Sequence, residues 1–437
     1  MAKLVIASGR PLKGTISLAG AKNSSFKLMI AALLASGESR LTNLSQIEEV
    51  RHVKLMLEAL GARVNPVADR GWLIDTRGVR AAVIPEALGW FSRASTLFLG
   101  PLLARFGRGA VPLPGGDLIG KRPLERHFAG LSRFGVQLNL KGKLVEARVD
   151  KLRGADYRFA KNSHTGTETL IMTAVLAEGR SVITNSAREP EVDDLIGCLN
   201  QMGAKITRSG RTLTIDGVKA LRPARYRVMP DRNQAVSYAI AALATRGEVT
   251  INNARPEHLR AFLAKLKLAG AGAEISSGGI RFFFKRQLQA TGIITQPHPG
   301  FMTDWEPLWS VLMTQAVGRS KIVEGVFLNR FQFVPDLMAM GAKIRYFDPR
   351  PENPDKFYNF NLTDDRAGNR HGIEISGPTP LKGGKFAVKD IRNGATLTIA
   401  GLLASGQTVL ANAELIDRGY ENFAGQLCHL GASIKKI

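Results

Sequence analysis

The 437 residues exceed what one hydrophobic core usually serves, so two domains are expected, and 44% hydrophobic with 22% charged residues is ordinary for a globular chain. The net charge of +23, from 60 Lys and Arg against 37 Asp and Glu, favours anionic partners, but the cations follow the whole chain without a nucleic-acid motif, so no nucleic acid is expected as a partner. No stretch approaches the ~20 apolar residues of a membrane span, and the first residues do not form a signal peptide, which predicts a cytoplasmic protein without membrane contact.

A short phrase close to Leu-Gly-Ala-x-Ile recurs along the chain. Its glycines are Gly61, Gly135, Gly203, Gly270, Gly341 and Gly431. Before each glycine lies a segment of helical apolar period, such as "VRHVKLMLEAL", and after it come residues typical of a strand. Glycine tolerates the left-handed backbone that ends many helices, so each phrase predicts a helix, a glycine cap and a strand. Cys198 and Cys428 lie in two of these helical patterns, so we expect both to be reduced thiols in the core.

Most units contain a second phrase upstream of the first. It combines an apolar helix, a small-residue turn and a strand, as in "FKLMIAALLASGESRLTNL". Each unit therefore predicts the order helix, strand, helix, strand, and six units of about 70 residues fill the chain. Solenoid repeats are usually ~20–50 residues long, so these larger units favour two pseudo-symmetric α/β domains of three units each. The last interval is the longest because a Pro-, Asn- and Asp-rich insertion near residues 346–380 intervenes, which we expect to be a surface loop.

Three short motifs combine charged residues with a turn or a helix start. Lys22, in "GAKNSS", stands at the start of an apolar helix, where an ammonium group and a helix N-terminus suit an anion. A solvated lysine beside a capping Asn-Ser pair fits the same pattern. Asp117 lies in the glycine-rich stretch "LPGGDLIGKRP", just before Lys121 and Arg122. Asp304, in "HPGFMTDWEP", is a candidate base on a loop, and the alternative, that it caps the helix that follows, can hold together with this role.

Taken in order along the chain, these phrases resemble the enolpyruvyl transferase family. The matching phrases are "GAKNSSFKLMIAALLA", "SRASTLFLGPLLARFGRGAVPLPGGDLIGKRP", "NSAREPEVDDL", "PHPGFMTDWEP", "VFLNRF" and "IDRGYE". The resemblance covers essentially the whole chain and implies a two-domain inside-out α/β barrel of six repeated helix/strand units, with helices inside and sheets outside. The first domain is expected at residues 22–229, with a mobile active-site loop near residues 111–123. The second is expected at residues 1–21 together with residues 230–437.

The resemblance also implies an activity. The enolpyruvyl group of phosphoenolpyruvate would pass to the 3'-hydroxyl of UDP-N-acetylglucosamine with release of phosphate, in the first committed step of peptidoglycan synthesis. Neither a metal nor an organic cofactor is implied, and the histidines show no metal-ligand spacing. Gln234, Ala235 and Arg126 depart from the family's pattern, so another acceptor, such as a free nucleotide or shikimate 3-phosphate, stays open. A non-catalytic relative that binds anions or nucleic acid stays open as well.

The resemblance assigns roles to particular residues. Asp304 would accept the proton of the sugar hydroxyl, while Lys22 and Arg418 would bind phosphoenolpyruvate, which carries about three negative charges. Asp117 replaces the cysteine that in most relatives is the general acid toward C3 and the target of fosfomycin, so insensitivity to fosfomycin is expected. The implied substrate contacts are Asn23, Arg93, Arg122, Pro123, Lys161, Ser163, His164, Thr165, Asp304, Val326, Arg330 and Arg392. His164 is expected to be a loop or stacking residue rather than a catalyst.

Overall fold

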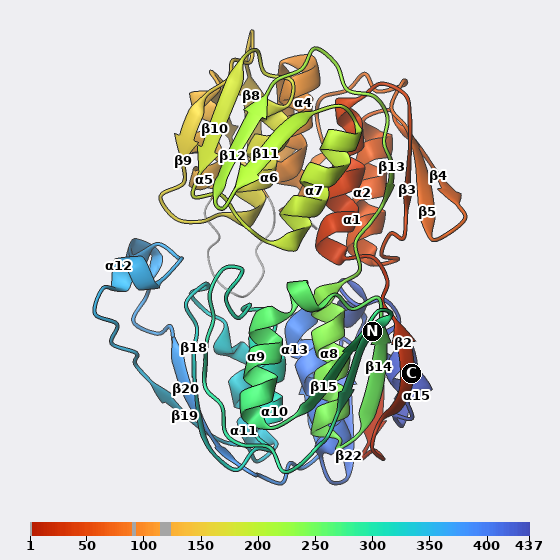
Figure 1. Cartoon of the computed structure of the whole chain (residues 1–437), viewed down its shortest axis with the longest axis vertical. Helices are drawn as coiled ribbons and strands as arrows, with labels where there is room; N and C mark the ends of the chain where they lie inside the picture. The colour runs from red at the N-terminus through yellow and green to blue at the C-terminus, as the bar shows by residue number, and fades with distance from the viewer. Residues whose placement is uncertain (1, 90–92, 114–123) are drawn as a thin grey trace. The chain divides into compact units, whose positions relative to one another are not determined.

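The protein forms two compact units (Figure 1). The structure is a computed structural model that describes residues 2–89, 93–113 and 124–437. The described residues of 19–229 make up the N-terminal unit, and residues 2–18 with 230–437 make up the C-terminal unit. The boundaries between the units therefore lie after residues 18 and 229. The boundaries expected from the sequence lie after residues 21 and 229.

The N-terminal unit repeats an arrangement of one sheet and two helices. Its sheets have the strand orders β13-β3-β5-β4, β11-β12-β10-β9 and β6-β8-β7. The strands are β3 (Glu38–Thr42), β4 (Arg63–Val67), β5 (Gly71–Asp75), β6 (Arg108–Pro112), β7 (Gln137–Lys141), β8 (Leu144–Arg148), β9 (Asp156–Arg158), β10 (Arg180–Thr184), β11 (Lys205–Ser209), β12 (Thr212–Asp216) and β13 (Arg225–Arg227). The helices are α1 (Lys22–Ala31), α2 (Glu48–Ala59), α3 (Glu86–Gly89), α4 (Leu99–Phe106), α5 (Glu125–Arg133), α6 (His164–Ala174) and α7 (Pro190–Gln201).

The C-terminal unit repeats the same arrangement, with sheets ordered β21-β22-β1-β23, β15-β16-β14-β2 and β17-β18-β20-β19. The strands are β1 (Leu4–Ala7), β2 (Lys13–Ser17), β14 (Glu248–Asn252), β15 (Gly272–Ser276), β16 (Gly279–Phe283), β17 (Ile293–Ile294), β18 (Gly318–Val323), β19 (Lys343–Phe347), β20 (Gly372–Gly377), β21 (Lys385–Ala387), β22 (Gln407–Ala411) and β23 (Ile434–Lys436). The helices are α8 (Arg232–Ala244), α9 (Arg260–Ala269), α10 (Glu306–Met313), α11 (Val334–Ala339), α12 (Pro354–Phe357), α13 (Ile391–Leu403), α14 (Glu414–Asp417) and α15 (Phe423–His429). The first two strands of the chain belong here, because β1 pairs with β22 and β23, and β2 pairs with β14.

The predicted glycine caps are confirmed. All six marker glycines have positive φ angles, between 82° at Gly270 and 105° at Gly203. Each follows the last residue of α2, α5, α7, α9, α11 or α15 by one or two positions. A side chain is strained in this backbone region, which explains why the same residue type recurs where each of these helices ends.

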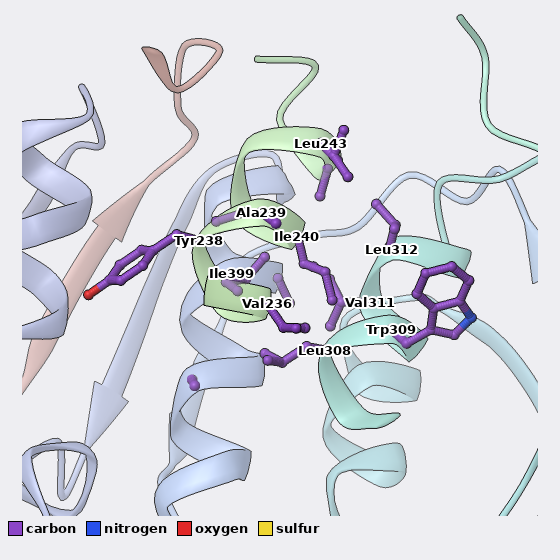
Figure 2. Close-up of a cluster of buried hydrophobic side chains, with 14 of the residues drawn as sticks. Val236, Tyr238, Ala239, Ile240, Leu243, Leu308, Trp309, Val311, Leu312 and Ile399 are labelled. Atoms are coloured by element: carbon purple, nitrogen blue, oxygen red, sulfur yellow. The ribbon is translucent and has the colours of Figure 1, made fainter. Parts of the chain in front are cut away.

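In the C-terminal unit three apolar helices form the centre of the core. Every residue of α8 and of α10 is buried, as is most of α13. Figure 2 shows Ile240 of α8, Leu312 of α10 and Ile399 of α13 in one cluster. Helices that are apolar on all sides are stable only inside a core, so the sheets cover them on the outside. The predicted helix/strand repeat with interior helices is therefore confirmed.

Two expectations about the C-terminal unit change. Cys428 is exposed, so only Cys198 is a core thiol. The buried residues of α15 include Phe423 and Leu427, and Cys428 lies off the face that these two residues form. The insertion occupies residues 348–371, between β19 and β20, and most of its residues are exposed or half-buried, as expected of a surface segment, but Tyr358 and Phe360 are buried.

Candidate active site

In the C-terminal unit three of the expected site residues, Asp304, Val326 and Arg330, lie in segments that leave one sheet at the same end. β17 runs parallel to β18, with Ile294 opposite Val323. Parallel strands end on the same side of a sheet, so the segments that follow β17 and β18 emerge together. The first of these segments carries Asp304, and the second carries Val326 and Arg330.

Two arginines hold the Asp304 carboxylate. Arg330 Nη2 donates to Oδ1 at 3.0 Å, and Arg392 Nη2 donates to Oδ2 at 3.0 Å. The carboxylate side chain is 25% exposed, whereas that of Arg330 is 4% exposed. Charge-assisted bonds to both oxygens fix the orientation of the carboxylate, as a base needs. The helix-capping alternative is wrong, because Trp305 occupies the N-cap position of α10 and Asp304 bonds to arginines instead.

Arg392 connects Asp304 to a second set of polar groups. Its Nη1 donates to Tyr420 Oη at 2.6 Å, and this hydroxyl is 2.8 Å from Ser237 Oγ. Burial works against its charge, but Asp304 and Tyr420 outweigh burial, so the pKa of Arg392 lies above its ordinary value. The guanidinium is therefore a permanent cation at this position. Arg418 lies two residues before Tyr420 in the sequence and is the C-cap residue of α14.

Two buried glutamates behind Asp304 were missed by the sequence analysis. Glu324 accepts from the backbone N–H groups of Val326 and Phe327 at 2.6 and 2.8 Å, and from Thr303 Oγ1 at 2.8 Å. Glu306, in the first turn of α10, is fully buried. Burial raises the pKa of both carboxyls. An acidic residue inside an apolar segment was the available signal for each, because such a residue needs partners when buried.

In the N-terminal unit Lys22 is the first residue of α1. Its Nζ lies 3.0 Å from Glu49 Oε2, and its side chain is 17% exposed. The alternative in which Asn23 caps this helix is wrong, because Ala21 is the N-cap residue and Asn23 lies within the first turn. Lys22 and Asn23 are thus both presented at the N-terminus of a ten-residue helix, a position that favours anions.

The expected nucleotide segment, residues 161–165, which the family resemblance assigns to uridine binding, leads into α6. Ser163 is its N-cap residue and accepts from the Gly166 N–H at 3.2 Å, while Lys161 precedes it and Thr165 follows. His164 is not a loop residue, because it is the first residue of the helix. Its Nε2 lies 3.1 Å from Glu168 Oε1 and 3.0 Å from Lys27 Nζ.

Lys27 and Glu168 form a buried ion pair that the half-buried His164 also contacts, a cluster that sequence reasoning missed. Lys27 Nζ donates to Glu168 Oε1 at 2.5 Å, and neither residue is more than 1% exposed. Burial and Lys27 lower the pKa of His164, but Glu168 and Glu189 outweigh them and the pKa lies above its ordinary value. The cluster joins the start of α6 to α1, so two of the segments that carry expected substrate contacts in this unit share one support.

Asp194 of α7 is a further buried carboxyl. It accepts from Tyr226 Oη at 3.0 Å and from the Met229 N–H at 3.3 Å, and burial raises its pKa to about 6. The folded state therefore keeps this proton more tightly than the unfolded state. Its contribution to stability is fully present below the unfolded pKa near 3.8 and is lost as pH rises through about 6.

Asp194→Asn is expected to flatten the pH dependence of stability in this window. A shift of about 2 pKa units corresponds to about 2 kcal/mol between pH 4 and pH 6.5, and the amide does not titrate. Urea unfolding of the full chain at both pH values, for parent and variant, measures the difference. Equal pH slopes for the two proteins would show that Asp194 does not carry this proton.

Several expected residues cannot be placed in the site. Asp117, Arg122 and Pro123 lie outside the described residues, and Arg93 is the first residue of the 3-10 helix η2 (Arg93–Phe98). Within residues 2–89, 93–113 and 124–437, no group of three or more His, Cys, Asp and Glu is arranged to hold a metal ion. None of the helices in these ranges is long and apolar enough to cross a membrane.

The residues that depart from the expected pattern lie on two helices. Gln234 and Ala235 are buried in the first turn of α8, where Asp231 is the N-cap residue. Arg126 of α5 donates to the Asn162 carbonyl at 2.9 Å. Asn162 directly precedes the N-cap residue of α6. Arg126 therefore supports the expected nucleotide segment through a hydrogen bond to the backbone of that segment.

The chain matches known proteins along its full length. A family model described as EPSP synthase (3-phosphoshikimate 1-carboxyvinyltransferase) matches residues 6–427. The UDP-N-acetylglucosamine 1-carboxyvinyltransferase of Desulfatibacillum aliphaticivorans is 38% identical over 438 residues, which cover 100% of both chains. The UDP-N-acetylglucosamine 1-carboxyvinyltransferase 1 of Carboxydothermus hydrogenoformans is 40% identical, over 100% of this chain and 99% of its own.

Solved structures share the fold at lower identity. The enolpyruvyl transferase NikO from Streptomyces tendae matches with a TM-score of 0.86 and 22% identity, over 100% of this chain and 98% of its own. An EPSP synthase from Acinetobacter baumannii matches with a TM-score of 0.73 and 19% identity over 100% of both chains. These two structures therefore support the two-unit architecture of repeated sheets and helices.

Proposed function

Because the chain belongs to the EPSP synthase family of enolpyruvyl transferases, we propose that it transfers the enolpyruvyl group of phosphoenolpyruvate to the 3'-hydroxyl of UDP-N-acetylglucosamine. Phosphate is released, and the reaction is the first committed step of peptidoglycan synthesis. The observation that carries the proposal is the Asp304 carboxylate held between Arg330 and Arg392, in a chain that matches UDP-N-acetylglucosamine 1-carboxyvinyltransferases from end to end.

The reaction is an addition followed by an elimination. In the addition, the oxygen of the sugar hydroxyl bonds to C2 of phosphoenolpyruvate while Asp304 takes the hydroxyl proton. Asp117 gives a proton to C3. In the elimination, the bond from C2 to the phosphate oxygen breaks, phosphate leaves, and C3 returns a proton to the Asp117 carboxylate as the double bond forms again. Lys22, Arg392 and Arg418 neutralise the carboxylate and phosphate charges during both steps.

The remaining substrate contacts are proposed from the same family relationship. Those in the N-terminal unit are Asn23, Arg93, Arg122, Pro123, Lys161, Ser163, His164 and Thr165, and those in the C-terminal unit are Val326 and Arg330. Both substrates are small anions of the cytoplasm, so we propose a cytoplasmic enzyme without a nucleic acid partner. The proposed chemistry needs no metal or organic cofactor, because proton transfer and charge neutralisation come from side chains.

A comparison of acceptors tests the function. The purified chain is incubated with phosphoenolpyruvate and, separately, UDP-N-acetylglucosamine, a free uridine nucleotide or shikimate 3-phosphate, and phosphate release is followed. We expect release with UDP-N-acetylglucosamine and a product heavier than the acceptor by one enolpyruvyl group. Release only with another acceptor would reassign the substrate. No release with any acceptor, together with tight salt-sensitive binding of nucleic acid, would identify a non-catalytic relative.

Fosfomycin distinguishes the proposed acid from the usual one. We expect the parent chain to stay active in fosfomycin, because a carboxylate at Asp117 is not the thiolate that this inhibitor alkylates. Asp117→Cys is expected to keep activity and to become sensitive, with a mass increase of one inhibitor molecule. Time-dependent loss of phosphate release measures both. An Asp117→Asn variant as active as the parent would remove Asp117 from the role of acid.

A further inference from the structure

The insertion and the segment after β18 leave the sheet at one place. In β19 and β20, Phe347 and Gly372 are paired, so the insertion at residues 348–371 leaves and re-enters the sheet between neighbouring positions. Gly372 is also paired with Val323, the last residue of β18. The segment that begins at Glu324 therefore starts beside both ends of the insertion, and Figure 1 shows α12 of the insertion beyond the ends of β18, β19 and β20.

Aromatic side chains of the insertion pack on this segment. Tyr358 and Phe360 stack with ring centroids 4.7 Å apart, and Phe360 stacks on His371 at 4.9 Å. The two residues are 7% and 4% exposed, and the cluster they form includes Leu328, which is 4% exposed. Leu328 belongs to the segment after β18 and, among the described residues, is the buried member of this cluster that lies outside the insertion.

Backbone hydrogen bonds join the same two parts. The Asn359 N–H donates to the Gly325 carbonyl at 2.7 Å, and the Glu324 N–H donates to the His371 carbonyl at 2.9 Å. The Glu324 carboxyl, which belongs to the segment, accepts from the Val326 and Phe327 N–H groups and from Thr303 Oγ1. Residues 324–328 are thus fixed by the insertion and by the hydrogen bonds of their own buried carboxyl.

The held segment continues directly into the site. Arg330 lies two residues after Leu328, with its guanidinium 6.0 Å from the centre of the Phe327 ring. The same guanidinium donates to Asp304 at 3.0 Å. A displacement of Leu328 therefore shifts Arg330. Because Arg330 donates to Asp304, this shift changes the orientation of the Asp304 carboxylate.

We propose that the insertion at residues 348–371 is a positioning element of the active site, whose aromatic cluster holds residues 324–330 so that Val326 and Arg330 meet the acceptor and Asp304 correctly. The inference rests on the proposed function for its effect on turnover. Tyr358 and Phe360 are positioning residues, because the contact that links them to the site is their packing on Leu328. Any substrate contact remains with Val326 and Arg330.

Substitution of Tyr358 tests the proposal. Tyr358→Ala is expected to lower kcat/KM for UDP-N-acetylglucosamine by about 10- to 100-fold, since small misplacements at a site have effects of this size. The KM for the acceptor should rise, while that for phosphoenolpyruvate stays within about twofold. Tyr358→Phe keeps the ring and should restore parent kinetics. Leu362→Ala, at a residue of the insertion that is 38% exposed, is the matched control and should change nothing.

Hydrogen exchange gives a readout that does not depend on activity. The amides of residues 325–330 should exchange faster in Tyr358→Ala than in the parent or in Tyr358→Phe, while those of β18 and β20 keep their protection. If Tyr358→Ala does not fold, Phe360→Leu, which removes the stack but keeps an apolar side chain, replaces it. Parent-like kinetics and parent-like exchange of this segment would overturn the proposal. A parent inactive with every acceptor would refute the proposed function, and exchange would still decide whether the insertion holds the segment.

Discussion

Asp304→Asn is expected to lower kcat by roughly 10²–10⁴-fold, the range typical for loss of a general base. The amide has nearly the same shape, but it cannot take the proton of the sugar hydroxyl. Its carbonyl oxygen can still accept from Arg330 or from Arg392, so the side chain should stay close to its parent position. Phosphate release at saturating concentrations of both substrates measures kcat, and the KM values should change far less than kcat.

The C-terminal unit offers a matched control for this substitution. Asp336 of α11 is also a carboxylate held by a cation and an amide, because Lys389 Nζ donates to Oδ2 at 2.9 Å and Asn393 Nδ2 at 3.1 Å. Asp336→Asn is expected to leave kcat near the parent value. Should Asp304→Asn turn over within a few-fold of the parent, or should both variants lose the same activity, Asp304 is not the base.

The repeat could be predicted because its signals are local. A glycine after a helical apolar segment, such as Gly203 or Gly431, marks a helix end through its own backbone preference, and the structure gives both a positive φ. Helices without a polar face, such as α8, indicate an interior position from their composition alone. Neither signal depends on which distant segment packs against it, so the order of elements follows from the sequence.

The pairing of site residues depends on distant contacts and was not accessible in the same way. Asp304 meets Arg330 and Arg392 from 26 and 88 residues away, and no local pattern says which cation it receives. The helix-cap reading of Asp304 was reasonable by local rules, but two guanidinium groups compete more strongly than backbone N–H groups. The aromatic residues of the insertion lay in a Pro- and Asn-rich segment that resembles a loop, and only the sheet topology shows that Leu328 is available to cover them.

Lys27 and Glu168 are another pair whose contact could not be predicted from local sequence. Loss of this contact is expected to have the largest effect on stability. They are 141 residues apart, yet they form an ion pair whose two side chains are 2% and 0% exposed. Glu168 Oε1 receives both Lys27 and His164, whereas its buried Oε2 has no hydrogen-bond partner in the described structure. The carboxylate therefore relies on Lys27 for much of its compensation.

Lys27→Met is expected to lower the free energy of unfolding by about 3–5 kcal/mol, because it leaves a buried carboxylate without its main partner. Urea unfolding of the full chain measures the loss. The loss should be smaller at pH 5.5 than at pH 8, since the pKa of His164 lies above its ordinary value and the imidazolium partly replaces the lysine at the lower pH.

Two companion variants separate the buried charge from simple loss of packing. Lys54→Met removes a more exposed pair, in which Lys54 Nζ lies 2.7 Å from Glu58, and should cost less than about 1 kcal/mol. In Lys27→Met/Glu168→Leu both charges are absent, so most of the lost stability should return. If the double variant is as unstable as Lys27→Met, the loss comes from packing of the lysine chain against α6 and not from an uncompensated carboxylate.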